Sequence, residues 1–174
     1  FWEGVVRFND WHQHRIAKLV VKKLFGTISE KKIGILGFSF KANTNDTRES
    51  AAIQICRDLL EEGAELLIHD PKVSQAQIAT DLNLKPISEK EINSEINPNS
   101  GKTGWRKCDD IYSCFKNVDA VLILTEWREY AEIDWNIASK LMRKPAWVFD
   151  SRSIVECNEV KNVNLNLWRV GDGA

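Results

Sequence analysis

Basic and aromatic side chains follow two apolar runs of the sequence. The run "IGILGF" at residues 33–38 is followed by Phe40 and Lys41, and then by Arg48. The run "AWVFD" at residues 146–150 is followed by Arg152. Cations that converge at strand ends can neutralise a phosphate or diphosphate, and arginine adds a planar fork that binds two oxygens at once. These residue types therefore indicate an anionic, nucleotide-like ligand.

The three cations also have simpler interpretations. Lys41 and Arg152 could be solvated surface charges, and Arg48 could pair with the neighbouring Asp46 or Glu49. The pattern alone leaves both interpretations open for Lys41 and Arg152, and it favours a local ion pair for Arg48.

Strands and helices alternate along the chain. Apolar runs at "IGILGF", "ELLIH", "AVLIL" and "AWVF" predict buried strands, and "VNLNLWRVG" predicts a closing strand at the sheet edge. Helical patterns lie between them, one capped by Asp46 or Thr47 and ended by Gly63, others at "CDDIYSCFKNV" and "IDWNIASKLM". This alternation predicts an open, mostly parallel α/β sheet with helices on both faces.

A long helix is predicted ahead of the sheet. Apolar residues from Val5 to Phe25 fall at helical spacing, and Gly26 can end the helix. We therefore divide the chain into a helical segment, residues 1–26, and one α/β domain, residues 27–174. Because the chain starts inside this helical pattern and without methionine, we expect it to be a piece of a longer protein. The stretch 84–105 shows no apolar periodicity and is interpreted as a surface loop.

Strand ends are where open parallel sheets bind their ligands. In the first strand end, alternation about Ser39 should send Phe38 and Phe40 to the same side, with Phe38 the better candidate for a cap on the core. Asp70 ends the second strand, where dinucleotide-binding folds hold a ribose hydroxyl, but it could equally cap the turn before Pro71. The missing G-x-G-x-x-G pattern argues against a whole NAD bound in the standard way.

Composition excludes several classes of function. The chain has 174 residues, 43% of them hydrophobic, and 24 Lys and Arg against 25 Asp and Glu, which gives no reason to expect nucleic acid or an anionic membrane as partner. No apolar run approaches a membrane span. Four cysteines without C-x-x-C spacing favour a reducing cytoplasm, and neither a metal site nor a catalytic nucleophile is evident.

Four segments, in order, resemble the C-terminal domain of nucleotide-sugar dehydrogenases: "GFSFKANTNDTRES", "HDPKV", "LILTEW" and "FDSRS". The first matches the signature G-x-x-FK-x-x-T-x-D-x-R-x-S. The TEW segment, together with Asp150 and Arg152, is most similar to the UDP-glucose 6-dehydrogenase branch of the UDP-glucose/GDP-mannose dehydrogenase family. The resemblance covers nearly the whole chain. It departs at Ser151 and Ser153, where this branch often has other residues, and at the loop 97–104.

The resemblance implies a role for each of the residues with which we began. Phe40, Lys41 and Arg152 would contact the UDP-glucose substrate, and Arg48 would reach toward NAD. A separate N-terminal domain would bind NAD and supply the catalytic cysteine and lysine, so no catalytic residue is assigned here. The central helix would join the domains and mediate a homodimer.

Two alternatives to this interpretation stay open. The substrate could be another nucleotide sugar, such as GDP-mannose or UDP-N-acetylmannosamine. The chain could also be a stand-alone nucleotide-sensing module that regulates a partner through its N-terminal helix.

Overall fold

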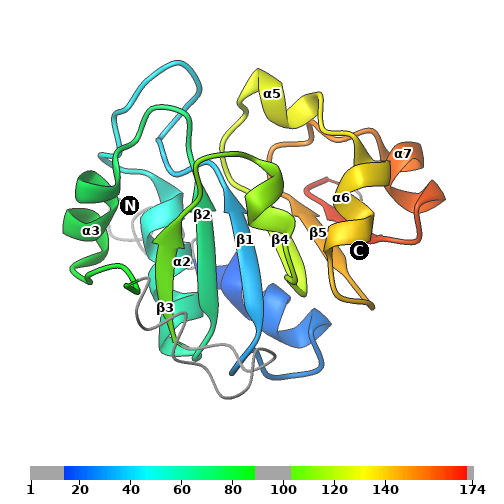
Figure 1. Ribbon diagram of the computed structural model, residues 1–174, viewed down its shortest axis with the longest axis horizontal. Helices are drawn as coiled ribbons and strands as arrows, with labels where there is room; N and C mark the ends of the chain where they lie inside the picture. Colours follow the sequence, from blue (N-terminus) through cyan, green and yellow to red (C-terminus); the bar gives the residue numbers. More distant parts are fainter. Residues whose placement is uncertain (1–13, 89–102, 172–174) are drawn as a thin grey trace, which may run out of the picture.

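The protein is described by a computed structural model that covers residues 14–88 and 103–171 (Figure 1). Six parallel strands form one sheet in the order β3-β2-β1-β4-β5-β6. Their bounds are Lys32–Leu36 (β1), Glu65–His69 (β2), Gly104–Lys107 (β3), Ala120–Ile123 (β4), Trp147–Asp150 (β5) and Asn166–Arg169 (β6). The strand order reverses between β1 and β4, and this reversal is the point where such sheets bind ligands. The predicted open parallel sheet is confirmed.

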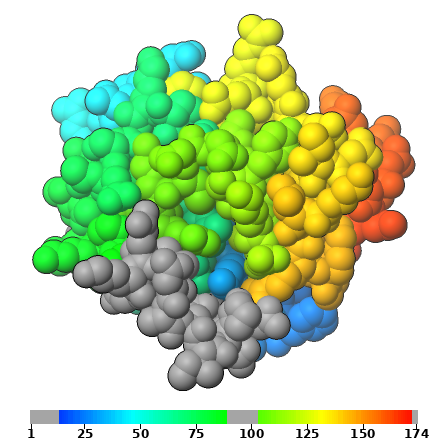
Figure 2. Space-filling view, viewed as in Figure 1, coloured from blue at the N-terminus to red at the C-terminus, as the bar shows by residue number. Residues whose placement is uncertain are grey.

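Helices cover both faces of the sheet. Residues 14–23 are helical, and the further helices are Ala51–Glu61 (α2), Gln75–Leu82 (α3), Arg128–Ala131 (α5), Trp135–Leu141 (α6), Cys157–Asn162 (α7) and the 3-10 helix Tyr112–Phe115 (η1). On one face, side chains of η1 and α6 pack against the sheet, and the space-filling view shows these segments at the surface (Figure 2). None of the described helices is long and apolar enough to cross a membrane.

Alternate residues of each strand build the two halves of the core. Ile33 and Ile35 of β1 pack with α2, α3 and the helix over residues 14–23, whereas Leu36 packs with η1 and α6 on the opposite face. All five residues of β2 are buried, as expected for a strand that is covered on both faces. This two-sided burial fixes the sheet, and therefore fixes where each strand ends.

The start of α2 differs from the prediction. Its cap is Ser50, whose hydroxyl accepts a hydrogen bond from Ala52 N, so the predicted caps Asp46 and Thr47 are wrong. The chain needs residues 38–50 to form the loop after β1, which delays the helix by one turn. Ser50 also donates its hydroxyl to Phe38 O at 2.8 Å, so the same residue caps the helix and anchors the start of the loop.

Two further regions refine the predicted organisation. The stretch 84–105 was expected to lack regular structure, but its end begins the edge strand β3, with Trp105 fully buried. Gly26 ends the N-terminal helix as expected, with a φ of +82° and its N–H bonded to Val21 O. The first part of the predicted helix, up to residue 13, lies outside the described residues, and nothing in the structure tests the division at residue 26.

Candidate functional site

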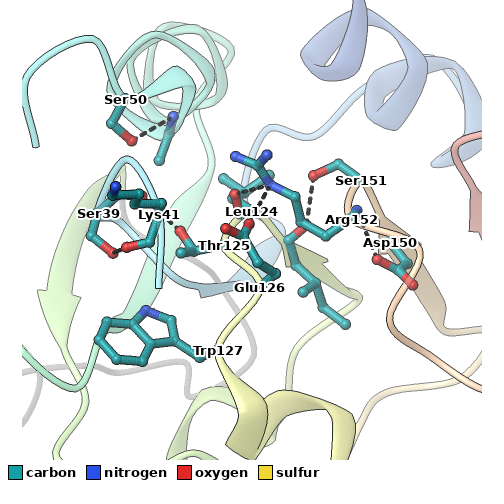
Figure 3. A network of polar contacts seen from close by, with 12 residues as sticks. Ser39, Lys41, Ser50, Leu124, Thr125, Glu126, Trp127, Asp150, Ser151 and Arg152 are labelled. Atoms are coloured by element: carbon teal, nitrogen blue, oxygen red, sulfur yellow. Dashed lines mark hydrogen bonds and ion pairs between the residues drawn. The ribbon is translucent and has the colours of Figure 1, made fainter. Parts of the chain in front are cut away.

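Three loops meet at the carboxyl edge of the sheet (Figure 3). Residues 37–50 follow β1, residues 124–127 follow β4 and residues 151–155 follow β5. We call these the first, middle and third loops. Because β4 lies between β1 and β5, the ends of the outer two strands are only about 10 Å apart. Side chains from the first and third loops can therefore reach one small ligand.

The middle loop holds the first loop in place. The Thr125 hydroxyl donates to Ser39 O at 2.8 Å, and it lies directly against Gly37. A Cβ atom added at Gly37 would stand 2.4 Å from the Thr125 Cβ, and the φ of +94° at Gly37 disfavours any other residue. Gly37 thus permits close packing between two loops. In a dinucleotide-binding fingerprint, by contrast, the glycines let the backbone come close to the cofactor pyrophosphate.

Asp70 organises the first loop from the end of β2. Its Oδ2 accepts hydrogen bonds from Phe38 N at 2.8 Å, Ser39 N at 3.0 Å and Trp127 Nε1 at 3.3 Å, while Oδ1 accepts from Lys72 N and Val73 N at 2.9 Å. Burial raises the pKa of the Asp70 carboxyl, but the backbone N–H groups outweigh burial and hold this pKa below its ordinary value. Asp70 is 1% exposed, so its role is to fix the loop and not to meet a ribose.

The two aromatic residues of the first loop separate. Phe38 is fully buried, which confirms it as a cap on the core, whereas Phe40 is 49% exposed. The expectation that both rings share one side is wrong, because Phe38 N and Phe40 N bond to different partners, Asp70 and the carbonyl of Asp46, and the loop no longer alternates as a strand. Phe40 therefore offers an apolar surface at the rim.

Lys41 extends from the same rim. Its side chain is exposed, and its ammonium group has no hydrogen bond or ion pair with another residue of the described chain. Only its backbone is used, because Lys41 O accepts from the Ser39 hydroxyl at 3.1 Å. The loop is thus held by its backbone while the cation stays available to a ligand.

Arg152 approaches from the third loop (Figure 3). Asp150 accepts from Arg152 N at 2.9 Å and from Val155 N at 2.8 Å, which fixes the turn after β5. The Arg152 side chain is one third exposed, with Nε donating to Leu124 O at 2.7 Å. The middle loop therefore contacts both cation-bearing loops, and that shared contact was not visible in the sequence.

Arg48 lies apart from this arrangement. Its Nε and one terminal nitrogen donate to the two carboxylate oxygens of Asp46 at 3.0 and 2.7 Å, which lowers the pKa of Asp46 to about 2. The local ion pair weighed from the sequence is therefore present. The Arg48 side chain is 87% exposed, and its role toward NAD stays a prediction.

No catalytic centre is evident among the described residues. Cys56 is completely buried on α2, and burial raises the pKa of its thiol far above the ordinary value. No group of three or more His, Cys, Asp or Glu side chains in the described ranges could hold a metal ion. What the edge of the sheet offers is two exposed cations, an exposed aromatic ring and rigidly fixed loops.

These features define a Rossmann-like α/β domain whose carboxyl edge suits an anionic ligand. The chain belongs to the UDP-glucose/GDP-mannose dehydrogenase family, because a sequence model of the UDP-binding domain of that family matches residues 34–157. This range includes Lys41, Arg48 and Arg152. The resemblance noted in the four motifs is thereby confirmed.

Named relatives agree with this assignment. The chain is 37% identical over 171 residues to a UDP-glucose 6-dehydrogenase of Drosophila melanogaster and 38% identical over 173 residues to one of Pongo abelii, in both cases over 98% of its length. It spans only 34% and 33% of those two proteins, about a third of their length. A solved UDP-glucose dehydrogenase from Pyrobaculum islandicum shares the fold, with a TM-score of 0.65, 22% identity and coverage of 96% of this chain and 31% of that one.

Proposed function

We propose that this chain is the UDP-binding part of an NAD-dependent UDP-glucose 6-dehydrogenase, which oxidises UDP-glucose to UDP-glucuronate. Lys41 and Arg152 bind the diphosphate from opposite sides, and Phe40 contacts the substrate at the same rim. The fragment is inactive alone, because the catalytic cysteine and lysine belong to an N-terminal domain that this chain does not include.

The observation that supports this proposal best is the shared support of the two cationic loops. Thr125 holds the loop of Lys41 through Ser39 O, and Leu124 O holds the side chain of Arg152. Two cations are thus presented on neighbouring, preorganised loops, so little conformational entropy remains to be lost when a diphosphate binds. A diphosphate needs this kind of charge from the protein, and charge-assisted hydrogen bonds are the strongest ones available.

Arg48 is the residue of this chain that we assign to the NAD cofactor. The first turn lacks the glycines that admit a pyrophosphate, whereas Arg48 is an exposed cation in the same loop. NAD, when bound, supplies the hydride acceptor of the reaction. Arg48 would contribute charge toward it after exchanging its contact with Asp46.

Calorimetric titration of UDP into the 174-residue chain tests the proposal. We expect binding at millimolar concentration or tighter, weakened about tenfold by Lys41→Ala and by Arg152→Ala, since each removes one charge-assisted hydrogen bond. Lys31→Ala is the matched control, because Lys31 precedes β1 at the opposite edge of the sheet. A folded chain that binds no UDP at millimolar concentration, or that binds it equally well after all three substitutions, would contradict the proposal.

The identity of the sugar nucleotide is a separate question. The 37 and 38% identities are to proteins that act on UDP-glucose by name, so we place this chain with them rather than with enzymes for GDP-mannose or UDP-N-acetylmannosamine. Competition calorimetry with GDP addresses the base, and a substrate panel on the full-length enzyme addresses the sugar. Oxidation of GDP-mannose without oxidation of UDP-glucose would overturn the assignment.

We also propose that the full-length enzyme works in the cytoplasm as a homodimer through the N-terminal helical segment, residues 1–26, and that it supplies polysaccharide biosynthesis. Light scattering of the full-length enzyme measures the oligomeric state. A stand-alone sensor would instead require a gene that begins at this helix.

A further inference from the structure

The Arg152 guanidinium group has two contacts with the middle loop on one side. Its Nε lies 2.7 Å from Leu124 O and 3.4 Å from a carboxylate oxygen of Glu126. Both groups belong to the middle loop, two residues apart, the first as hydrogen-bond acceptor and the second as ion-pair partner. Figure 3 shows the carbonyl and the carboxylate on the same flank of the arginine side chain.

These contacts determine which N–H groups of Arg152 are available to a ligand. Arginine has one N–H at Nε and four on its two terminal nitrogens. The single Nε–H is donated to Leu124 O and Glu126 forms an ion pair at the same nitrogen, whereas the structure gives the terminal nitrogens no hydrogen bond with other described residues. An anion therefore has to be met end-on, by the two terminal nitrogens, and not by the fork between Nε and one terminal nitrogen.

We propose that Glu126 is a positioning residue for Arg152, which turns the two terminal nitrogens of the guanidinium toward the diphosphate. The inference rests on the proposed function, because it names the residue that prepares one of its two cations. Glu126 does not touch the ligand. It acts by limiting rotation of a side chain that is one third exposed and would otherwise sample several rotamers.

Two effects of Glu126 on an anion have opposite signs. Its negative charge repels a diphosphate, while its ion pair with Nε restrains the Arg152 side chain. Both effects are electrostatic, but the Glu126 oxygen lies 3.4 Å from Nε and the diphosphate would meet the far end of the guanidinium, so distance and solvent weaken the repulsion more than the ion pair. We therefore expect the orienting effect to dominate.

Two substitutions decide which effect is larger. Glu126→Gln removes the charge with little change in shape, and Glu126→Ala removes the carboxylate side chain altogether. In calorimetric titrations with UDP, we expect each variant to bind about threefold more weakly than the unmodified chain, the effect of losing one partly exposed ion pair, whereas loss of repulsion alone would tighten binding in both. In the Arg152→Ala background, Glu126→Ala should have no further effect, since there is no guanidinium left to orient.

A spectroscopic readout follows orientation directly. The Nε–H resonance of Arg152, assigned by its loss in Arg152→Ala, should be protected from exchange by Leu124 O in the unmodified chain, and should exchange faster in Glu126→Gln and Glu126→Ala, where the ion pair that restrains the side chain is lost. Urea unfolding midpoints that do not change would show that the domain stays intact.

The outcomes distinguish the two claims. If the unmodified chain binds no UDP, the proposed function fails, and this inference fails with it. If UDP binds and Arg152→Ala weakens it, but Glu126→Ala binds as well as or better than the unmodified chain, only the positioning role is overturned. Equal losses from Glu126→Ala with and without Arg152 would also overturn it, because Glu126 would then act independently.

Discussion

Replacement of Asp70 by asparagine tests how the first loop is held. The carboxylate accepts five N–H groups, three at Oδ2 and two at Oδ1, and it is 1% exposed. Asparagine keeps one acceptor oxygen and turns an NH2 group toward at least two of these donors. Each hydrogen bond to a charged group contributes about 1.5–3 kcal/mol, so loss of two lowers the free energy of unfolding by about 3–6 kcal/mol.

Urea unfolding of the purified chain at pH 7, followed by tryptophan fluorescence, measures this loss. Asp109→Asn is the matched control, because Asp109 is an exposed carboxylate that should change stability by no more than about 0.5 kcal/mol. We also expect UDP binding to weaken in Asp70→Asn, since the backbone of Phe38 and Ser39 leads directly to Lys41. An unfolding midpoint equal to that of the unmodified chain would refute the view that Asp70 fixes the loop.

Other predictions concern the same edge of the sheet. The folded-state pKa of Asp70 lies below its ordinary value, so the contribution of Asp70 to stability is complete above about pH 4 and is lost as pH falls through the folded pKa. Urea unfolding midpoints measured between about pH 2 and 5 should therefore fall with decreasing pH, and they should fall less in Asp70→Asn. Gly37→Ala should destabilise the chain by about 2–4 kcal/mol, because strain at a positive φ adds to the overlap with Thr125. Gly26→Ala is its control, since Gly26 has a positive φ but nothing within 4 Å of the added Cβ; equal losses in these two glycine variants would refute the proposed close packing.

The central part of the fold could be predicted because its signals are local. Strands β1, β2, β4 and β5 are short apolar runs bounded by polar turns, and alternation with helices determines a parallel sheet. Strand β3 was missed, because half of it is Arg106 and Lys107 and it becomes a strand only by pairing with β2 at the edge. The short helices α5 and α7 likewise have too few residues to show a period.

The candidate site was predictable only in outline. Because parallel strands end at the same edge of a sheet, the sequence was enough to predict that the loops of Lys41 and Arg152 lie at one edge. The hydrogen bonds that hold these loops join residues far apart in the sequence, such as Asp70 with Phe38 N and Leu124 O with the Arg152 side chain. Such contacts leave no local pattern, and the Ser50 cap was missed because Asp46 offered a better local match.

The most direct test of the account is a crystal structure of the chain with UDP. We predict that the diphosphate lies between the first and third loops, with oxygens about 3 Å from the Lys41 ammonium and from the terminal nitrogens of Arg152. UDP bound at the amino edge of the sheet, or at the carboxyl edge with its diphosphate turned away from both cations, would contradict the account.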